Sequence, residues 1–252
     1  MNLIRNLYLK TQRHKFYRPF KPIGIGRRES FFIAPAENIK EFFKALPFIA
    51  GIRKLGSVML FVPEVFMPYI KNFRVNYFQI IFYKEFPQVL TREFDILKNE
   101  IKKISFNWLI ELNHRANLNL PNLVNAEKRV TFYDKKNFPY YNILIKGGIE
   151  ALVNFFQISL VDPVSLFKFN KLELKGILKG LPQEQPRLFF NEADKGAEEL
   201  ERLKWQGGIV YHKKNDDIEK GLKELYLCDA YFGPDDEFCE IAKIFKKEII
   251  TI

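Results

Sequence analysis

The sequence predicts an α/β protein built on parallel β-sheets, because short apolar runs alternate with segments of helical periodicity. In the last quarter of the chain, residues 230–232 form an apolar run that Gly233-Pro234-Asp235 ends with residues typical of a turn. Apolar residues then recur at helical spacing over 238–245, and residues 248–252 form a second apolar run. A strand, a helix and a strand in this order are the unit of a parallel sheet covered by helices.

The turn at Gly233 is the first candidate for a binding site. In parallel sheets ligands bind at the carboxyl ends of the strands, so a nucleotide is expected at this turn. One glycine between a strand and a helix is common, however, and a plain connection with a solvated acidic helix start fits equally.

Length and composition suit one large domain or two small ones. The chain has 252 residues, of which 47% are hydrophobic, and this is enough for a core. The formal net charge of +10 favours anionic partners such as nucleic acid, phospholipid head groups or phosphorylated glycolipids. Cys228 and Cys239 are the only cysteines, and two free thiols fit a reducing compartment.

The sequence contains no apolar segment long enough to span a bilayer, and its start lacks the features of a secretory signal. We therefore expect a cytoplasmic protein, and we keep open a peripheral position at the inner face of the membrane.

Residues 1–28 form a basic segment in which Leu3, Ile4, Leu7 and Tyr8 are spaced to make one helical face. Such a helix suits an anionic membrane surface, but a helix packed on its own domain with its charges in water has the same pattern. Basic residues interleaved with aromatic ones also suit single-stranded nucleic acid. No RNA- or DNA-binding motif accompanies them, so nucleic acid is not an expected partner.

The first half of the chain is predicted to repeat the strand and helix unit. Residues 31–34 and 58–62 are apolar runs expected to be buried strands, and residues 39–52 between them keep helical spacing. Pro47 should kink or restart this helix because it lacks the N–H group. Further strands are predicted at 78–83, 108–112 and 126–133, with a helix at 91–103.

The second half offers about four strands. The predicted elements are a helix at 172–178, a strand at 187–190, a helix at 196–205 and a strand at 208–212. Asp216-Asp217-Ile218-Glu219 then has the pattern of a capping box with aspartate as the cap, and its helix leads to the turn at Gly233.

The C-terminal stretch resembles the donor-site segment of family 9 glycosyltransferases, the heptosyltransferase group. The matching positions are the Asp229-Ala230 pair that leads the strand, the glycine at Gly233, the acid at Asp235 and the helix alanine at Ala242. The resemblance implies that Gly233 and Asp235 face a nucleotide-sugar donor, and Lys195 is a further candidate for the donor pyrophosphate.

Three acidic residues depart from the family pattern. Asp236 and Glu237 replace the Ser-Gly pair that approaches the donor phosphates, and Glu240 replaces a histidine. Three carboxylates at a helix start repel a diphosphate unless a cation intervenes.

The resemblance extends through the first half of the chain. Leu46-Pro47 matches the family's Leu-Pro, which places Glu41 where the family has the aspartate proposed to deprotonate the acceptor. A carboxylate suits this role because it accepts the proton of the attacking hydroxyl. An acid in the first turn of a helix is also favoured by the helix dipole alone, so a purely structural role for Glu41 stays open.

The acceptor side is expected at the end of the strand at 108–112. That strand resembles the family's Asp-x-x-Ile-Asp-Leu strand, with Asn107 and Glu111 in place of the acids. Asn113, His114 and Arg115 follow it and are predicted to contact the acceptor, although polar residues are common at any strand end.

The resemblance implies a GT-B-like fold: two Rossmann-like domains facing a cleft, with the second one reduced. We expect residues 1–150 to form the acceptor-side domain and residues 151–252 the donor-side domain. The implied function is the transfer of a sugar from a nucleotide-activated donor to a lipid-linked or saccharide acceptor of the cell-envelope type, by inversion and without a metal or another cofactor. The acidic replacements favour an alternative, a GT-B-like binding protein with a degenerate donor site.

Overall fold

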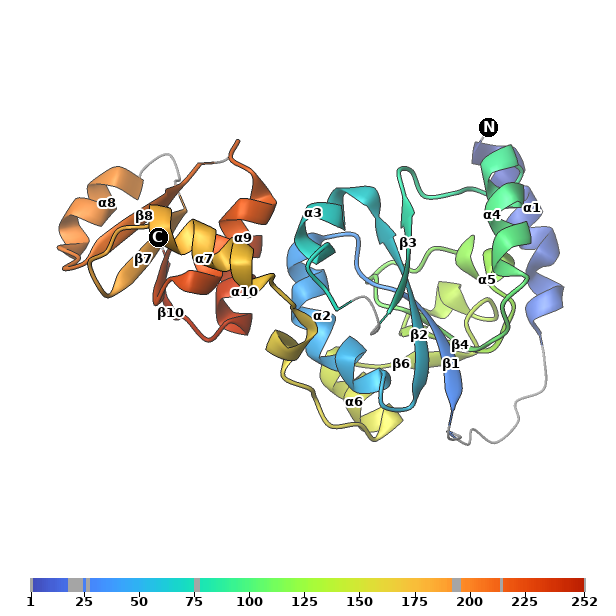
Figure 1. The fold of residues 1–252 in the computed structure, drawn as a ribbon. Coiled ribbons are helices and arrows are strands. Elements are labelled where there is room, and N and C mark those ends of the chain that lie inside the picture. Colours follow the sequence, from blue (N-terminus) through green and yellow to red (C-terminus); the bar gives the residue numbers. More distant parts are fainter. Residues whose placement is uncertain are drawn as a thin grey trace. The chain divides into compact units, whose positions relative to one another are not determined.

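The computed structural model describes residues 2–17, 25, 28–74, 78–191, 196–213 and 215–251. The chain forms two compact units (Figure 1). The first comprises Met1–Val65 and Val75–Val161, and the second comprises Phe66–Arg74 and Asp162–Ile252. Each unit contains one parallel sheet with helices, which confirms the predicted α/β class.

The first unit is built on a six-stranded parallel sheet in the order β3-β2-β1-β4-β5-β6. Its strands are β1 (Glu29–Ala34), β2 (Gly56–Pro63), β3 (Gln79–Tyr83), β4 (Phe106–Glu111), β5 (Ala126–Phe132) and β6 (Ile143–Ile145). Its helices are α1 (Asn2–Gln12), α2 (Ile39–Ile52), α4 (Arg92–Ile101), α5 (Leu120–Leu123) and α6 (Ile149–Phe156), with short 3-10 turns η1 (Arg13–Phe16) and η3 (Lys135–Asn137). This is the strand order of a Rossmann fold: strands are added in one direction from β1 to β3 and in the other direction from β4 to β6.

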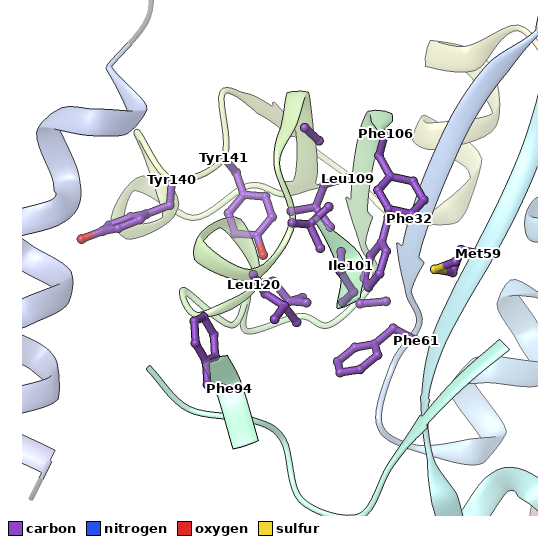
Figure 2. Packing of buried hydrophobic residues seen from close by; sticks show 14 of the residues in the cluster. Phe32, Met59, Phe61, Phe94, Ile101, Phe106, Leu109, Leu120, Tyr140 and Tyr141 are labelled. Atoms are coloured by element: carbon purple, nitrogen blue, oxygen red, sulfur yellow. The ribbon is translucent and has the colours of Figure 1, made fainter. Parts of the chain in front are cut away.

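The sheet of the first unit is buried on both faces. Phe31 and Phe32 are neighbours on β1 and both are fully buried, so their side chains fill opposite sides of the sheet. Phe31 stacks on Trp108 at a ring separation of 6.1 Å and meets Phe156 of α6 edge to face. Phe32 belongs to the other cluster, which Figure 2 shows. A strand that is apolar on both faces is the reason that the runs in the sequence are continuous rather than alternating.

Helix α2 passes through Pro47 as one helix, so the proline does not restart it. Proline costs about 3 kcal/mol or more inside a helix. Phe42, Phe43 and Leu46 on this helix are at most 1% exposed, and each buried side chain of this size contributes about 1.5–3 kcal/mol. Burial therefore outweighs the local cost of the proline.

The second unit has a four-stranded parallel sheet in the order β10-β9-β7-β8. Its strands are β7 (Arg187–Asn191), β8 (Gly208–His212), β9 (Ala230–Gly233) and β10 (Glu248–Thr251). Its helices are α3 (Met67–Ile70), α7 (Lys171–Gly180), α8 (Gly196–Leu203), α9 (Ile218–Leu227) and α10 (Glu237–Ile244), and η4 (Pro163–Leu166) is a 3-10 turn; η2 (Glu64–Phe66) lies at the junction. The predicted aspartate cap is present, because Asp217 accepts the N–H of Glu219 at 2.9 Å.

The observed units differ from the predicted division after residue 150. Helix α6 belongs to the first unit because Phe156 packs on Trp108 and Phe48, with ring separations of 5.0 Å and 6.0 Å. The segment 66–74 belongs to the second unit, where the Tyr69 hydroxyl donates to Glu237 at 2.9 Å. Both assignments depend on contacts between residues far apart in sequence.

The N-terminal basic segment forms α1, which packs on its own unit. Tyr8 and Leu9 lie against the core cluster, and the Tyr140 hydroxyl donates to the carbonyl of Leu9. Leu3, Ile4 and Leu7 are 82%, 66% and 62% exposed. The predicted single apolar face is therefore divided, with Tyr8 turned inward and the other three residues in solvent. In the described part of the chain, no helix combines the length and apolarity needed to cross a bilayer.

Candidate functional site

The switch point of the first sheet lies between β1 and β4, whose carboxyl ends are adjacent. The segments that follow these strands, residues 35–38 and 112–119, meet there: the Glu37 N–H donates to the side chain of Asn113 at 3.0 Å. Helix α2 begins directly after the first of these segments. In Rossmann-type sheets this is the place where ligands bind.

Glu41 lies in the first turn of α2. Its N–H donates to the side chain of Asn38, the N-cap residue, at 3.2 Å. Its carboxylate pairs with the Lys44 ammonium at 2.8 Å, and both side chains are 43% exposed. The carboxylate is thus anchored and still accessible to a ligand.

Two cavities share Glu41 and His114. The first has a volume of about 300 Å³ and is also lined by Lys44 and Glu150 over an apolar floor. The second has a volume of about 600 Å³ and adds Arg115. The structure therefore brings the predicted base together with the predicted acceptor residues.

Glu111 organises the loop that carries these acceptor residues. It ends β4, is fully buried, and accepts hydrogen bonds from the Asn117 N–H at 2.7 Å and from the Asn113 amide at 3.2 Å. It also accepts from the hydroxyl of Tyr141. Burial raises the pKa of Glu111 to about 7, against the opposing effect of these hydrogen bonds.

The three predicted acceptor residues have different surroundings. Asn113 joins Glu37 to Glu111 and thereby fixes the loop. The His114 ring stacks on Phe132 at 5.7 Å, and Arg115 is exposed. Asn113 is mainly a structural link, whereas His114 and Arg115 present polar groups at the cavities.

The second sheet has its own switch point between β7 and β9. A cavity of about 250 Å³ lies at the carboxyl ends of its strands and is lined by Asn191, His212, Pro234 and Asp236. Tyr69, Ile218, Glu237 and Phe238 complete its lining. This cavity is in the region where the donor was expected.

The helix start at this cavity is already occupied by a carboxylate. Asp236 caps α10 by accepting the N–H groups of Phe238 at 3.0 Å and Cys239 at 3.1 Å. Asn191 and Tyr231 donate to the same carboxylate at 2.7 Å and 3.1 Å. Burial raises the pKa of Asp236, although the hydrogen bonds oppose this shift. An anion bound at this helix start would compete with Asp236 for these N–H groups.

The cavity contains a buried histidine, His212. The His212 ring packs against Phe238 at 4.7 Å and Phe189 at 5.4 Å, and it is 3% exposed. Burial lowers the pKa of His212. Its neighbour Gly221 leaves room for the ring, since a Cβ there would lie 2.5 Å from the imidazole.

Two of the predicted donor residues, Gly233 and Asp235, lie beside this cavity but do not line it. Gly233 is buried, and a Cβ at this position would lie 2.8 Å from the Tyr231 hydroxyl. Asp235 is exposed and lies 3.7 Å from Lys243. Lys195 lies outside the described residues. The adjacent Pro234 and Asp236 line the cavity in their place.

Sequence reasoning did not single out Asn191 and Tyr231 as part of the site. Asn191 ends β7 and Tyr231 lies within β9, so both look like ordinary strand residues. The one available signal was that Asn191 ends an otherwise apolar run. Among the described residues, no group of three or more His, Cys, Asp and Glu side chains is arranged to hold a metal ion.

The fold defines a Rossmann-like α/β protein with a cavity at the switch point of each sheet. The fold is similar to that of family 9 glycosyltransferases, as the sequence resemblance predicted. A family 9 glycosyl transferase from Veillonella parvula has a TM-score of 0.65 at 10% identity, over 92% of this chain and 83% of that one.

Two E. coli enzymes are also similar in structure. The ADP-heptose LPS heptosyltransferase II has a TM-score of 0.60 at 10% identity, over 88% of this chain and 84% of its own. A heptosyltransferase with bound ADP-2-deoxy-2-fluoro heptose has a TM-score of 0.58 at 11% identity, over 88% of both chains. No protein-family model and no curated protein matches the sequence, so the likeness is one of fold.

Proposed function

We propose that this protein is a glycosyltransferase that transfers a sugar from a nucleotide-activated donor to a lipid-linked or saccharide acceptor. The observation that carries the proposal is the convergence of Glu41, His114 and Arg115 around two cavities at the first switch point. The shared fold with heptosyltransferases, one of them with a bound ADP-sugar analogue, supports the same class of donor.

In the proposed reaction the acceptor hydroxyl attacks the anomeric carbon of the donor sugar and the nucleoside diphosphate leaves. Glu41 removes the proton of the hydroxyl as the new bond forms, which is the role of a general base. Lys44 holds the carboxylate in place through the 2.8 Å ion pair. Arg115 supplies a positive charge for an acidic or phosphorylated acceptor.

The donor is assigned to the second unit. The nucleoside enters the cavity lined by His212, Ile218 and Asp236, where the His212 ring offers a hydrogen bond to a base or a ribose. For an anionic or lipid-linked acceptor, we propose a cytoplasmic protein that acts at the inner face of the membrane.

Calorimetric titration with a panel of nucleoside diphosphates and nucleotide sugars tests the donor assignment. Ile218→Trp fills the cavity and should abolish saturable binding. Tyr211→Trp changes an exposed residue of β8 outside the cavity lining and should leave binding intact. Gly233→Trp is not a clean test, because even a Cβ at Gly233 meets the Tyr231 hydroxyl.

Flat titrations across the whole panel would contradict a working donor site. They are the result expected of the alternative, a GT-B-like binding protein with a degenerate donor site. Binding without transfer in the presence of acceptors would likewise point to that alternative.

A further inference from the structure

A cavity on the first unit, separate from both switch points, lies between the N-terminal helix and α4. Its volume is about 260 Å³, and α1, η1, α4 and residues 121–126 contribute its walls. Figure 1 shows α1 and α4 side by side at this end of the unit. We refer to it as the lysine pocket, because Lys15, Lys98 and Lys102 line it.

Every charged side chain of the lysine pocket is basic. Besides the three lysines it contains Arg129, and none of the residues that line it in the described chain is acidic. Gln12 contributes an amide that can donate hydrogen bonds. The pocket therefore has the chemistry of an anion site and not that of a general surface depression.

Arg129 places a buried, immobilised guanidinium at the lysine pocket. It is 3% exposed, and its guanidinium donates to the carbonyls of Tyr140 at 2.6 Å, Ala126 at 2.8 Å and Phe16 at 3.4 Å. It also lies over the ring of Phe16 at 5.3 Å. These contacts hold η1 against β5 and keep a positive charge at the pocket.

The lysines repel one another. The pKa of Lys98 is lowered by burial and by the positive charges of Lys102 and Lys15, while Asp95 partly offsets this shift. A bound anion would relieve this repulsion.

Helix α1 also carries exposed apolar side chains. Leu3, Ile4 and Leu7 are exposed on the same helix whose C-terminal part borders the pocket, so an apolar patch and a basic pocket belong to one element. Phosphorylated lipids combine these two properties, with an anionic head group above an apolar layer.

We propose that the lysine pocket binds the phosphate head group of an anionic membrane lipid while Leu3, Ile4 and Leu7 enter the lipid layer. The inference deepens the proposed function, since it names the surface through which a transferase for lipid-linked acceptors would reach its substrate. It does not depend on the donor cavity or on Glu41. Vesicle binding without nucleotide therefore tests it separately from sugar transfer.

The experiment is co-sedimentation of the full chain with phosphatidylcholine vesicles that contain or lack about one third phosphatidic acid, in about 0.1 M salt. Binding is expected only to the anionic vesicles. The triple variant Lys15→Gln, Lys98→Gln, Lys102→Gln should reduce the partition coefficient at least about tenfold. Each basic residue near an anionic surface adds to the electrostatic attraction between protein and vesicle. Leu3→Ala, Ile4→Ala, Leu7→Ala should reduce it by a similar factor because the apolar contact is lost.

A control variant with the same net charge separates the pocket from diffuse attraction. Lys54, Lys135 and Lys136 are exposed lysines of the first unit that do not line the pocket, and their change to Gln should reduce binding less than about threefold. An equal loss in both lysine variants would overturn the proposal. Binding of inorganic phosphate in the pocket without vesicle binding would show a soluble phosphate ligand and would also overturn it.

Discussion

Asn191 at the end of β7 donates a 2.7 Å hydrogen bond to Asp236, which caps α10. Tyr231 of β9 donates to the same carboxylate, so the start of α10 is tied to the two central strands of the second sheet. The N–H groups that could hold a donor phosphate are thus satisfied by the protein's own anion. This arrangement makes the donor site testable by changing one charge.

Asp236→Ser should strengthen the binding of nucleoside diphosphates at least about fivefold in calorimetry, because removing a like charge near the phosphates lowers their binding free energy by at least about 1 kcal/mol. Serine still caps the helix, so the fold should persist. Asp235→Asn removes the same charge from an exposed neighbour and should change binding less than twofold. Equal effects of the two variants would contradict a phosphate position at the start of α10.

Glu41→Gln should lower the rate of sugar transfer about 10²–10⁴-fold and leave donor binding unchanged, because the amide cannot accept the acceptor's proton. Single-turnover transfer from the donor found by titration measures this effect. Glu150→Gln is the matched control, since Glu150 lines the same cavity and its loss should cost less than about tenfold. A Glu41→Gln variant as active as the control would exclude Glu41 as the base.

Glu111 should make the first unit less stable as the pH rises from about 4.5 to about 7. Its pKa is raised by burial, so the folded state retains a proton that the unfolded state loses in this window. The free energy of unfolding is therefore highest below the unfolded-state pKa. It falls by roughly 3 kcal/mol in total as the pH rises through the folded-state pKa. Above about pH 7 this contribution is constant.

Urea unfolding at several pH values measures this dependence. Trp108 lies in the first unit, and Trp205→Phe leaves it as the remaining tryptophan, so its fluorescence reports on that unit. Glu111→Gln should flatten the dependence of the unfolding free energy on pH. Glu127→Gln, at an exposed position of β5, should leave this dependence unchanged. A slope that persists in Glu111→Gln would assign it to other carboxyl groups.

Phe156→Ala should destabilise the first unit by about 3–5 kcal/mol, because a fully packed ring is removed from between Trp108, Phe31 and Phe48. Urea unfolding followed by Trp108 fluorescence in the same Trp205→Phe background checks this value. Phe155→Ala, at the half-buried neighbour, should cost less than half as much. If Phe156→Ala left the unfolding free energy of the first unit unchanged, the assignment of α6 to that unit would be wrong.

The α/β class, most of the strands and the aspartate cap of α9 could be predicted from local sequence patterns. Phe31 and Phe32 mark a strand buried on both faces, and Asp217 marks a helix start, because both signals depend on steric and hydrogen-bond rules that act over a few residues. The family resemblance gave both Glu41 and Asn113 roles toward the acceptor, and the two residues line one cavity.

Which polar groups come into contact depends on the tertiary structure. Glu111 is held by Asn117 and Tyr141, and Asp236 is held by Asn191, a residue 45 positions earlier in the chain. The strand order sets such pairs, and that order follows from the packing of whole helices and sheets, which local periodicity does not encode. For the same reason Tyr8 is turned inward while Leu7 remains in solvent: a helix shows its periodicity in the sequence, but the surface it covers is chosen by the rest of the unit.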